Sequence, residues 1–385
     1  MKKYDVIIIG AGASGLTVGA NALKRGRKTA ILEMGSQPAR KVALSGGGRC
    51  NITNMAVGAD RYFGNNPQFV RGALSRVRPT DILQWMKQHY LGAVEKAPGQ
   101  YFCADGADAV VDALVQDAQG ADIFYNTDIK SVQKTDGLFI VQTNKNIFTS
   151  QSLVVASGGI SFPVAGVSDI GYKIAKQFGH RVEPIRPALC AMKLDCFGSE
   201  LAGVSIDVEV KVGKQVISDT LLFTHFGIGG PAIYRASVRD FSDGITINFC
   251  PKIDLAAEIC KAKHINGKKS MTGWLSQYIP ARIAKFFTGK NDKNIADWNN
   301  KEINFLVKQL SQFVIGADKI KLHNLQSAEI VRGGVDVADI SSKTMESKLC
   351  PGLFWVGEVM DISGDLGGFN LHWAWASGVV AGQNA

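Results

Sequence analysis

The chain has 385 residues, of which 46% are hydrophobic and 20% charged. This apolar content excludes disorder across the whole chain and leaves ample material for a buried core. The seven cysteines form no Cys-x-x-Cys pair, which argues against a disulfide framework, a zinc ribbon and a redox dithiol. We expect no metal site. The formal net charge of +9 raises the question of an acidic partner.

Two segments bear on where the protein works. The apolar run 5–9 is too short for the core of a signal peptide and ends in a glycine motif. Residues 366–385 lack formal charge over about the length of a membrane span. They contain four glycines together with Asn370 and His372, which suits a buried helix better than lipid. We therefore expect no membrane span and a cytoplasmic protein.

The first 32 residues predict a βαβ unit. Residues 5–9 form a continuous apolar run, as expected for a parallel strand buried on both faces. Residues 14–25 have a helical pattern that Gly26 is placed to end, and residues 28–32 predict a second strand. Residues 35–66, rich in Gly, Asn and Ser, are interpreted as an ordered functional loop.

The next hundred residues predict two helices and a group of strands. Residues 80–90 and 109–119 are helical in pattern. Residues 121–156 predict several short strands, with Asp136-Gly137 as a hairpin turn.

The pattern of apolar and polar residues changes after residues 183–187. Pro184 and Pro187 in this segment oppose any regular helix or strand. Residues 206–212 alternate apolar and polar side chains, which predicts a half-buried antiparallel strand with one face exposed to solvent. Further strands are expected at 221–223 and 245–249. From residue 254 to about 321 the pattern is helical and basic.

A glycine fingerprint is the strongest local motif. Residues 10–15 read GAGASG, between a predicted strand and a predicted helix, and Glu33 follows at the end of the next strand. In a dinucleotide site Gly10 allows the tight turn, Gly12 lets the backbone approach the pyrophosphate and Gly15 lets helix and strand pack closely. The helix N-terminus attracts the phosphates, and Glu33 would accept hydrogen bonds from the adenosine ribose.

A second glycine-dense block favours FAD over a nicotinamide cofactor. It comprises Gly357-Glu358, Gly364 and Gly367-Gly368-Phe369-Asn370-Leu371. A long cofactor needs contacts from distant segments, and residues 370–380 can form a helix. Its N-terminus, at Gly368, could stabilise negative charge on the pyrimidine side of a flavin.

Residues 41–54 read KVALSGGGRCNITN. This segment resembles the hallmark loop of one bacterial family of FAD-dependent oxidoreductases, which includes aminoacetone oxidases and 3-dehydro bile acid reductases. Ser157 replaces threonine in a block resembling Ala-Thr-Gly-Gly, and Gly229 replaces serine in the block FTHFGIGGPA at 223–232. Residues 344–348 and 357–378 match its C-terminal block.

The resemblance implies an α/β fold with a glutathione-reductase-like FAD-binding domain, an inserted β-barrel-like domain and a small helical domain. We assign residues 1–186 and 326–385 to the FAD-binding domain, 187–253 to the inserted β domain and 254–325 to the basic helical domain.

The expected FAD contacts combine the fingerprint, the residues matched by the resemblance and their immediate neighbours. Arg40 is added for its position beside the hallmark loop, and Ile129 would act through its backbone. The full set is Gly10, Gly12, Ala13, Ser14, Gly15, Glu33, Met34, Arg40, Lys41, Ser45, Arg49, Ile129, Ser157, Gly158, Gly357, Glu358, Gly368, Phe369, Asn370 and Leu371.

Three residues invite a catalytic role, but we assign none. His225 could donate a proton, although such a histidine is more often structural. Cys50 beside Arg49 could be a thiol of lowered pKa, but a packed small residue is the preferred interpretation. His372 lies between aromatic residues, where packing against the cofactor is favoured over acid catalysis. The flavin itself carries the difficult chemistry.

The basic helical segment has two interpretations. Residues 251–324 contain 13 Lys or Arg and 6 Asp or Glu, so their net charge is +7, which could serve RNA binding. We favour a solvated charged face because no RNA-binding module or aromatic interleaving is evident. Nucleic acid is thus not the expected partner, and the oligomeric state is left open.

We expect an FAD-dependent oxidoreductase that transfers a hydride between the flavin and a small organic substrate. NADH or NADPH would be a transient donor, because no second strand–glycine–helix fingerprint follows Gly15. Two alternatives stay open: an oxidase of a small amine or ketone that uses oxygen, and an RNA-binding flavoprotein.

Overall fold

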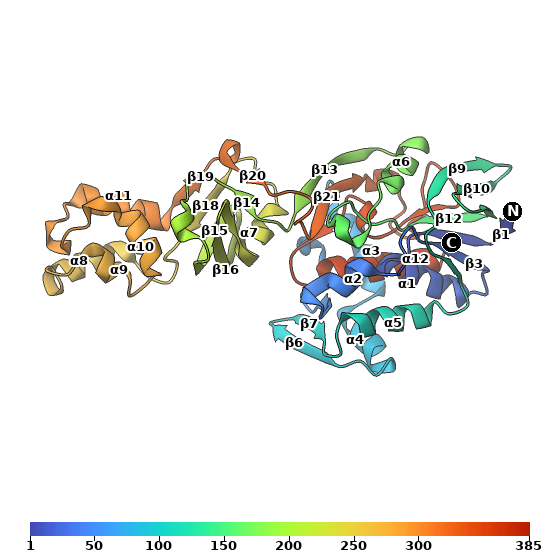
Figure 1. Cartoon of the computed structure of the whole chain (residues 1–385), viewed down its shortest axis with the longest axis horizontal. Coiled ribbons are helices and arrows are strands. Elements are labelled where there is room, and N and C mark those ends of the chain that lie inside the picture. Colours follow the sequence, from blue (N-terminus) through green and yellow to red (C-terminus); the bar gives the residue numbers. More distant parts are fainter. The chain divides into compact units, whose positions relative to one another are not determined.

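The computed structural model describes the backbone of residues 1–385 and every side chain except that of Asn291. The chain divides into two compact units (Figure 1). Unit 1 comprises Met1–Pro187 and Leu325–Ala385, and unit 2 comprises Ala188–Asn324. Each unit is described by itself.

A five-stranded parallel sheet forms the centre of unit 1, in the order β22-β12-β2-β3-β8. Four of its strands are buried at every residue, which explains their continuous apolar sequences. The strands are β2 (Val6–Ile9), β3 (Thr29–Leu32), β8 (Asp122–Phe124), β12 (Ser152–Val155) and β22 (Leu353–Trp355). The predicted βαβ unit is confirmed.

Two helices from opposite ends of the chain, α1 (Ala13–Leu23) and α12 (Phe369–Gly382), pack together in unit 1. A Cβ atom on Gly378 would lie 2.8 Å from the Ser14 carbonyl oxygen, and one on Gly382 would lie 2.7 Å from that of Val18. The glycines therefore permit backbone-to-backbone contact. No helix in the described part of the chain is long and apolar enough to cross a membrane.

The remaining elements of unit 1 surround this core. The predicted hairpin joins β9 and β10, where Asp136 and Gly137 have φ values of 51° and 79°, as a type I′ turn requires. The helices are α2 (Arg40–Leu44), α3 (Arg71–Arg76), α4 (Pro79–Gln88), α5 (Ala107–Asp117) and α6 (Ile170–Gln177). The strands are β1 (Lys2–Lys3), β4 (Asn51–Asn54), β5 (Tyr62–Phe63), β6 (Ala93–Ala97), β7 (Gln100–Cys103), β9 (Ile129–Thr135), β10 (Leu138–Thr143), β11 (Ile147–Ser150), β13 (Val182–Ala188), β21 (Ile330–Val335) and β23 (Ser363–Gly364).

Two local expectations need correction. Pro184 and Pro187 do not interrupt regular structure, because both lie in β13, which pairs only with β21 in a two-stranded sheet. Each strand of such a sheet has an open edge, where the missing proline N–H is tolerated. The segment 35–66 is not a continuous loop, since it contains α2, β4 and β5.

Unit 2 is built on a seven-stranded antiparallel sheet in the order β19-β18-β15-β16-β17-β14-β20. It is an open sheet of half-barrel type with two edge strands. Its strands are β14 (Met192–Lys193), β15 (Ser205–Val212), β16 (Gln215–Thr224), β17 (Gly227–Gly229), β18 (Ile245–Asn248), β19 (Phe313–Ile315) and β20 (Lys321–Leu322). Strands β19 and β20 follow helix α11 in the chain and lie at the end of the segment that we expected to be helical.

Helices α8–α11 are grouped at one end of the unit 2 sheet (Figure 1). One hydrophobic cluster spans sheet and helices, and the Phe197 ring shows how they are joined. Its centroid lies 5.0 Å from that of Phe223 on the sheet and 5.8 Å from that of Phe286 on a helix. The helices of unit 2 are α7 (Gly230–Ser237), α8 (Leu255–Ile265), α9 (Met271–Leu275), α10 (Ala281–Thr288) and α11 (Asn300–Ser311). Our separation of this region into two domains stays a prediction.

Candidate functional site

The three fingerprint glycines occupy different surroundings at the end of β2. Gly10 has φ 103°, and a Cβ there would lie 2.5 Å from the Ala156 carbonyl oxygen. A Cβ on Gly15 would lie 1.9 Å from the carbonyl oxygen of Gly10. A Cβ on Gly12 would meet nothing within 4 Å. The first and third glycines thus permit tight packing, and the second faces open space where a phosphate can approach the backbone.

The N-terminus of α1 opens directly beside Gly12. Within the described residues, no side chain caps this end and no acidic residue occupies its first turn. Its terminal N–H groups and the positive end of the helix dipole are therefore directed at the space next to Gly12. An anion is the natural partner of such a helix end.

Glu33 is held in place by the fingerprint backbone. One carboxylate oxygen accepts a hydrogen bond from the Ala11 N–H at 2.8 Å, and the other accepts from the Gly35 N–H at 2.7 Å. The residue is half-buried. An ionised carboxylate has about four acceptor sites, so Glu33 retains capacity for ribose hydroxyl groups.

Two further expected residues lie close to Glu33 in the fold. Met34 follows it directly and is 38% exposed. Ile129 begins β9 and is half-buried. The Thr127 N–H donates to the Glu33 carbonyl oxygen at 2.8 Å, which fixes the segment leading to Ile129 beside β3.

The ends of β12 and β22 converge on the same edge of the sheet as the fingerprint. Gly158 follows β12 with φ 70°, and a Cβ there would meet nothing within 4 Å. Gly357 follows β22 with φ 72°, and a Cβ there would lie 2.7 Å from the Ser14 hydroxyl oxygen. The buried Ser157 hydroxyl has no hydrogen-bond partner among the described residues. Ligands of open α/β sheets bind at this carboxyl edge.

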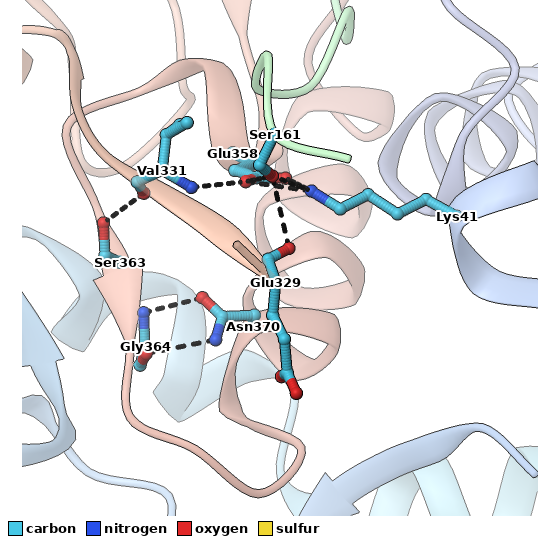
Figure 2. A network of polar contacts seen from close by, with 8 residues as sticks. All are labelled: Lys41, Ser161, Glu329, Val331, Glu358, Ser363, Gly364 and Asn370. Atoms are coloured by element: carbon cyan, nitrogen blue, oxygen red, sulfur yellow. Dashed lines mark hydrogen bonds and ion pairs between the residues drawn. The ribbon is translucent and has the colours of Figure 1, made fainter. Parts of the chain in front are cut away.

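An ion pair links two of the expected residues, Lys41 and Glu358 (Figure 2). The Lys41 Nζ lies 2.8 Å from a Glu358 carboxylate oxygen and donates to the Ser161 hydroxyl, also at 2.8 Å. The Val331 N–H donates to Glu358 at 3.0 Å. The sequence identified Lys41 and Glu358 separately. It did not indicate their pairing, nor the roles of Ser161 and Val331.

Glu329 is a neighbour of this ion pair that the sequence analysis missed. Its carbonyl oxygen accepts a hydrogen bond from Ser161 at 3.2 Å, while its side chain points away from Lys41 and Glu358 (Figure 2). The Glu329 residue is exposed to solvent, yet desolvation by nearby protein atoms raises the pKa of its carboxyl, and the charge of Lys41 opposes this rise. Only the fold brings this residue to the site.

The hallmark loop presents three consecutive glycines in left-handed conformation. Gly46, Gly47 and Gly48 have φ values of 58°, 65° and 80°, and Cβ atoms on the last two would meet nothing within 4 Å. Successive N–H groups in such turns form nests that bind anions. Around the loop, the Ser45 hydroxyl donates to the Val42 carbonyl at 2.7 Å.

The two arginines of this region differ in their contacts. Arg40 donates to the Val164 carbonyl oxygen at 2.9 Å. Arg49 is exposed and its guanidinium carbon lies 6.0 Å from the centroid of the Phe102 ring. Arg49 therefore remains available for a phosphate or carboxylate.

The N-terminus of α12, like that of α1, has no side-chain cap among the described residues. Gly368 has φ 92°, and a Cβ there would lie 2.7 Å from the Thr53 carbonyl oxygen. The Asn370 side chain is occupied by the backbone of Gly364, at 2.7 and 3.1 Å (Figure 2). Phe369 is buried and Leu371 half-buried, so this segment can offer a ligand its backbone N–H groups.

The three residues considered for catalysis differ in their surroundings. Cys50 is buried, and burial raises the pKa of its thiol to about 12, so the lowered-pKa hypothesis is wrong. His372 is buried with its ring nitrogens 2.8 Å from the Thr53 hydroxyl and 3.0 Å from the Val77 carbonyl. Burial lowers its pKa to about 4, so the ring is neutral. His225 is an exposed residue of unit 2.

Comparison with known proteins identifies the family. The model of the HI0933-like protein Rossmann domain matches residues 4–384. The chain belongs to this family. It is a family of FAD-dependent oxidoreductase enzymes, so the expected fold class and the resemblance are confirmed.

Three relatives match along nearly their whole length. The ribosomal RNA dihydrouridine synthase of Escherichia coli is 34% identical, over all of this chain and 98% of the relative. The protein of the same name from Haemophilus influenzae is 34% identical, over 98% of this chain and 97% of the relative. The 3-dehydro-bile acid delta(4,6)-reductase of Clostridium scindens is 26% identical, over 98% of both.

The residues present fit the FAD that the family implies. Gly12 leaves open space beside an uncapped helix N-terminus, which suits a pyrophosphate. Glu33 has acceptor capacity left, as a ribose requires.

Proposed function

We propose that this protein is an FAD-dependent reductase that converts uridine to dihydrouridine in ribosomal RNA. The observation that carries the proposal is the 34% identity, over essentially the whole of both chains, to two proteins named for that activity. The proposal replaces our preference for a small-molecule substrate and for a solvated basic face. The net charge of +9 suits an RNA substrate.

The proposed reaction adds two hydrogens across the C5–C6 double bond of uracil, which is conjugated with the C4 carbonyl. A hydride adds to C6 and a proton to C5. FAD, when bound and reduced, supplies the hydride. The name of the bile-acid relative describes the same class of reaction, the reduction of carbon–carbon double bonds conjugated with a carbonyl. Reduction of a small enone is therefore the second candidate.

We propose the following roles for the chain's own residues. The N-terminus of α1 beside Gly12 binds the FAD pyrophosphate, and Glu33 accepts hydrogen bonds from the ribose. The N-terminus of α12 at Gly368 places positive potential beside the pyrimidine edge of the isoalloxazine. The Lys41–Glu358 pair holds the loop after β22 against α2 and so fixes the shape of the site.

We further propose that NADH or NADPH is a transient donor without a dinucleotide-binding domain of its own. This follows from the fold of unit 2, an antiparallel sheet with helices, because nicotinamide domains are built on parallel βαβ units. Such binding should weaken as salt rises. Stopped-flow reduction under anaerobic conditions, at several donor and salt concentrations, tests this expectation.

The main test measures the product directly. Ribosomal RNA is prepared from a strain that lacks the gene for this protein and is incubated anaerobically with the FAD-loaded protein and NADPH or NADH. The RNA is then digested to nucleosides, which are analysed by mass spectrometry. We expect dihydrouridine to appear only when protein and donor are both present. Ribosomal RNA would also place the reaction in the cytoplasm, as the sequence led us to expect.

The outcome also separates the two candidates. A conjugated 3-oxo steroid is offered to the same preparation in parallel. Dihydrouridine without steroid reduction supports the proposal. Steroid reduction without dihydrouridine contradicts it and favours the second candidate.

A further inference from the structure

The hairpin between β16 and β17 in unit 2 presents an aromatic ring at its tip. Thr224 pairs with Gly227, so His225 and Phe226 form a two-residue turn. Phe223, just before the turn, is buried, whereas Phe226 is 41% exposed. The Phe226 ring is therefore only partly covered and is accessible at the hairpin tip.

The Phe226 ring rests on His323. The two ring centroids lie 4.5 Å apart with an angle of 27° between the planes, which is a stacked arrangement. The Leu194 N–H donates to the Phe226 carbonyl at 3.0 Å and the His323 N–H donates to the Ala191 carbonyl at 2.8 Å. These hydrogen bonds hold the backbone from which both rings project. Desolvation and the charge of Lys193 lower the pKa of His323, so the supporting ring is neutral.

Two lysines stand on the same face of the sheet. Lys193 in β14 is the register partner of Lys321 in β20 and of Gly227 on the other side. Directly paired residues of antiparallel strands share a face. Both lysines are exposed, whereas Met192 beside Lys193 is fully buried on the opposite face. Asp195 is also exposed, two residues after Lys193 in the chain. Its negative charge offsets part of the positive charge of the two lysines.

These four residues make up what we call the aromatic–lysine platform: Lys193, Phe226, Lys321 and His323. An aromatic ring close to paired cations is the combination that binds single-stranded nucleic acid, since bases stack on rings and phosphates attract lysines. We propose that the platform holds one unpaired base of an RNA strand by stacking on Phe226. The inference rests on the proposed function, which supplies the RNA.

Unit 2 also offers a matched control of similar composition. Phe305 on α11 is 66% exposed, and Lys301 and Lys308 lie four residues before and three residues after it, both exposed. Helical spacing places all three on one face. This second group has no stacked ring beneath its phenylalanine among the described residues.

Binding of a fluorescein-labelled 12-nucleotide oligouridine to the FAD-loaded full chain tests the proposal, measured by fluorescence anisotropy. Base stacking contributes roughly 1–3 kcal/mol, so Phe226→Ala should raise the Kd about 5- to 150-fold. Phe226→Trp should retain most of the affinity, because tryptophan keeps a π face. Phe305→Ala should bind as the wild type does. Flavin absorbance and thermal melts confirm that each variant is folded.

The lysines are tested through the salt dependence. Each phosphate contact to a single strand contributes a slope of about −0.7 in log K against log salt. The double variant Lys193→Gln/Lys321→Gln should therefore have a slope shallower by about 1.4. The control pair Lys301→Gln/Lys308→Gln should leave the slope unchanged.

Three results would overturn the platform: wild-type protein that fails to bind oligouridine, Phe226→Ala with unchanged affinity, or a larger loss from Phe305→Ala. The product assay separates this from failure of the proposed function. Dihydrouridine formation with unchanged Phe226→Ala binding refutes the platform alone. Oligouridine binding that depends on Phe226 without dihydrouridine formation supports the platform and refutes the proposed reaction.

Discussion

Replacement of Glu33 by alanine tests the placement of the adenosine half of FAD. The carboxylate accepts two backbone N–H groups at 2.8 and 2.7 Å and would also accept a ribose hydroxyl. A hydrogen bond to a charged group contributes about 1.5–3 kcal/mol. The loss of one ribose bond alone should therefore raise the Kd of FAD by about 10- to 150-fold.

The same substitution also affects the protein without cofactor. The N–H groups of Ala11 and Gly35 lose their acceptor, but Glu33 is only half-buried, so water can replace part of the interaction. We expect a loss of about 1 kcal/mol for each group, at the low end for an unsatisfied donor. This loss of folding stability must be separated from the loss of cofactor binding.

Asp5 provides a matched control at the opposite end of the same strands. Its carboxylate accepts the Lys28 N–H at 2.8 Å, beside the amino end of β2 and away from the fingerprint. Asp5→Ala should lower the unfolding free energy and leave FAD affinity unchanged. FAD titrations of the apoproteins, followed by quenching of flavin fluorescence, measure both variants. Equal FAD affinity of Glu33→Ala and Asp5→Ala would refute our placement of the ribose.

Three further predictions follow from the titratable groups. Burial lowers the pKa of His372 from 6.5 to about 4, so between these pH values the histidine is protonated in the unfolded chain and neutral in the folded one. The free energy of unfolding should therefore fall by about 1.4 kcal/mol for each unit by which the pH is lowered in this range. Denaturant unfolding of His372→Gln should lack this contribution. Because the pKa of Glu329 is raised in the folded protein, ionisation of this carboxyl destabilises the fold as the pH rises. Glu329→Gln should therefore have a higher melting temperature than the wild type at pH 7.5, and the difference should vanish towards pH 4.5. A difference in melting temperature that does not depend on pH would contradict this. Iodoacetamide at neutral pH should label the exposed Cys196 and Cys260 before Cys50, as peptide mass spectrometry can show.

The sequence predicted best what depends on neighbouring residues. The apolar run of β2, the glycines before α1 and the Asp136–Gly137 turn are local patterns, and each appears in the structure as expected. The prediction for residues 183–187 was wrong because it depended on the tertiary structure. Proline is tolerated in β13 because one edge of this strand in the two-stranded sheet is open.

The site was predictable only in part, because its contacts join distant segments. Lys41 and Glu358 are 317 residues apart in the chain, and Ser161 contacts the carbonyl of Glu329 over 168 residues. No local pattern marks Ser161 or Glu329 as a neighbour of the ion pair. Lys41 entered our expectations only through the family resemblance, whereas Glu358 was also part of the second glycine-dense block.

The path of the chain through unit 1 has a consequence for synthesis on the ribosome. β12 needs β22 as its second neighbour, and α1 needs α12, yet both partners lie beyond residue 352. Unit 2, by contrast, is continuous from Ala188 to Asn324. A nascent chain could therefore complete unit 2 while the fingerprint strand and helix still wait for their partners. Folding of unit 1 should thus be completed only after β22 and α12 have left the ribosome, and its unfinished sheet edge is exposed in the interval.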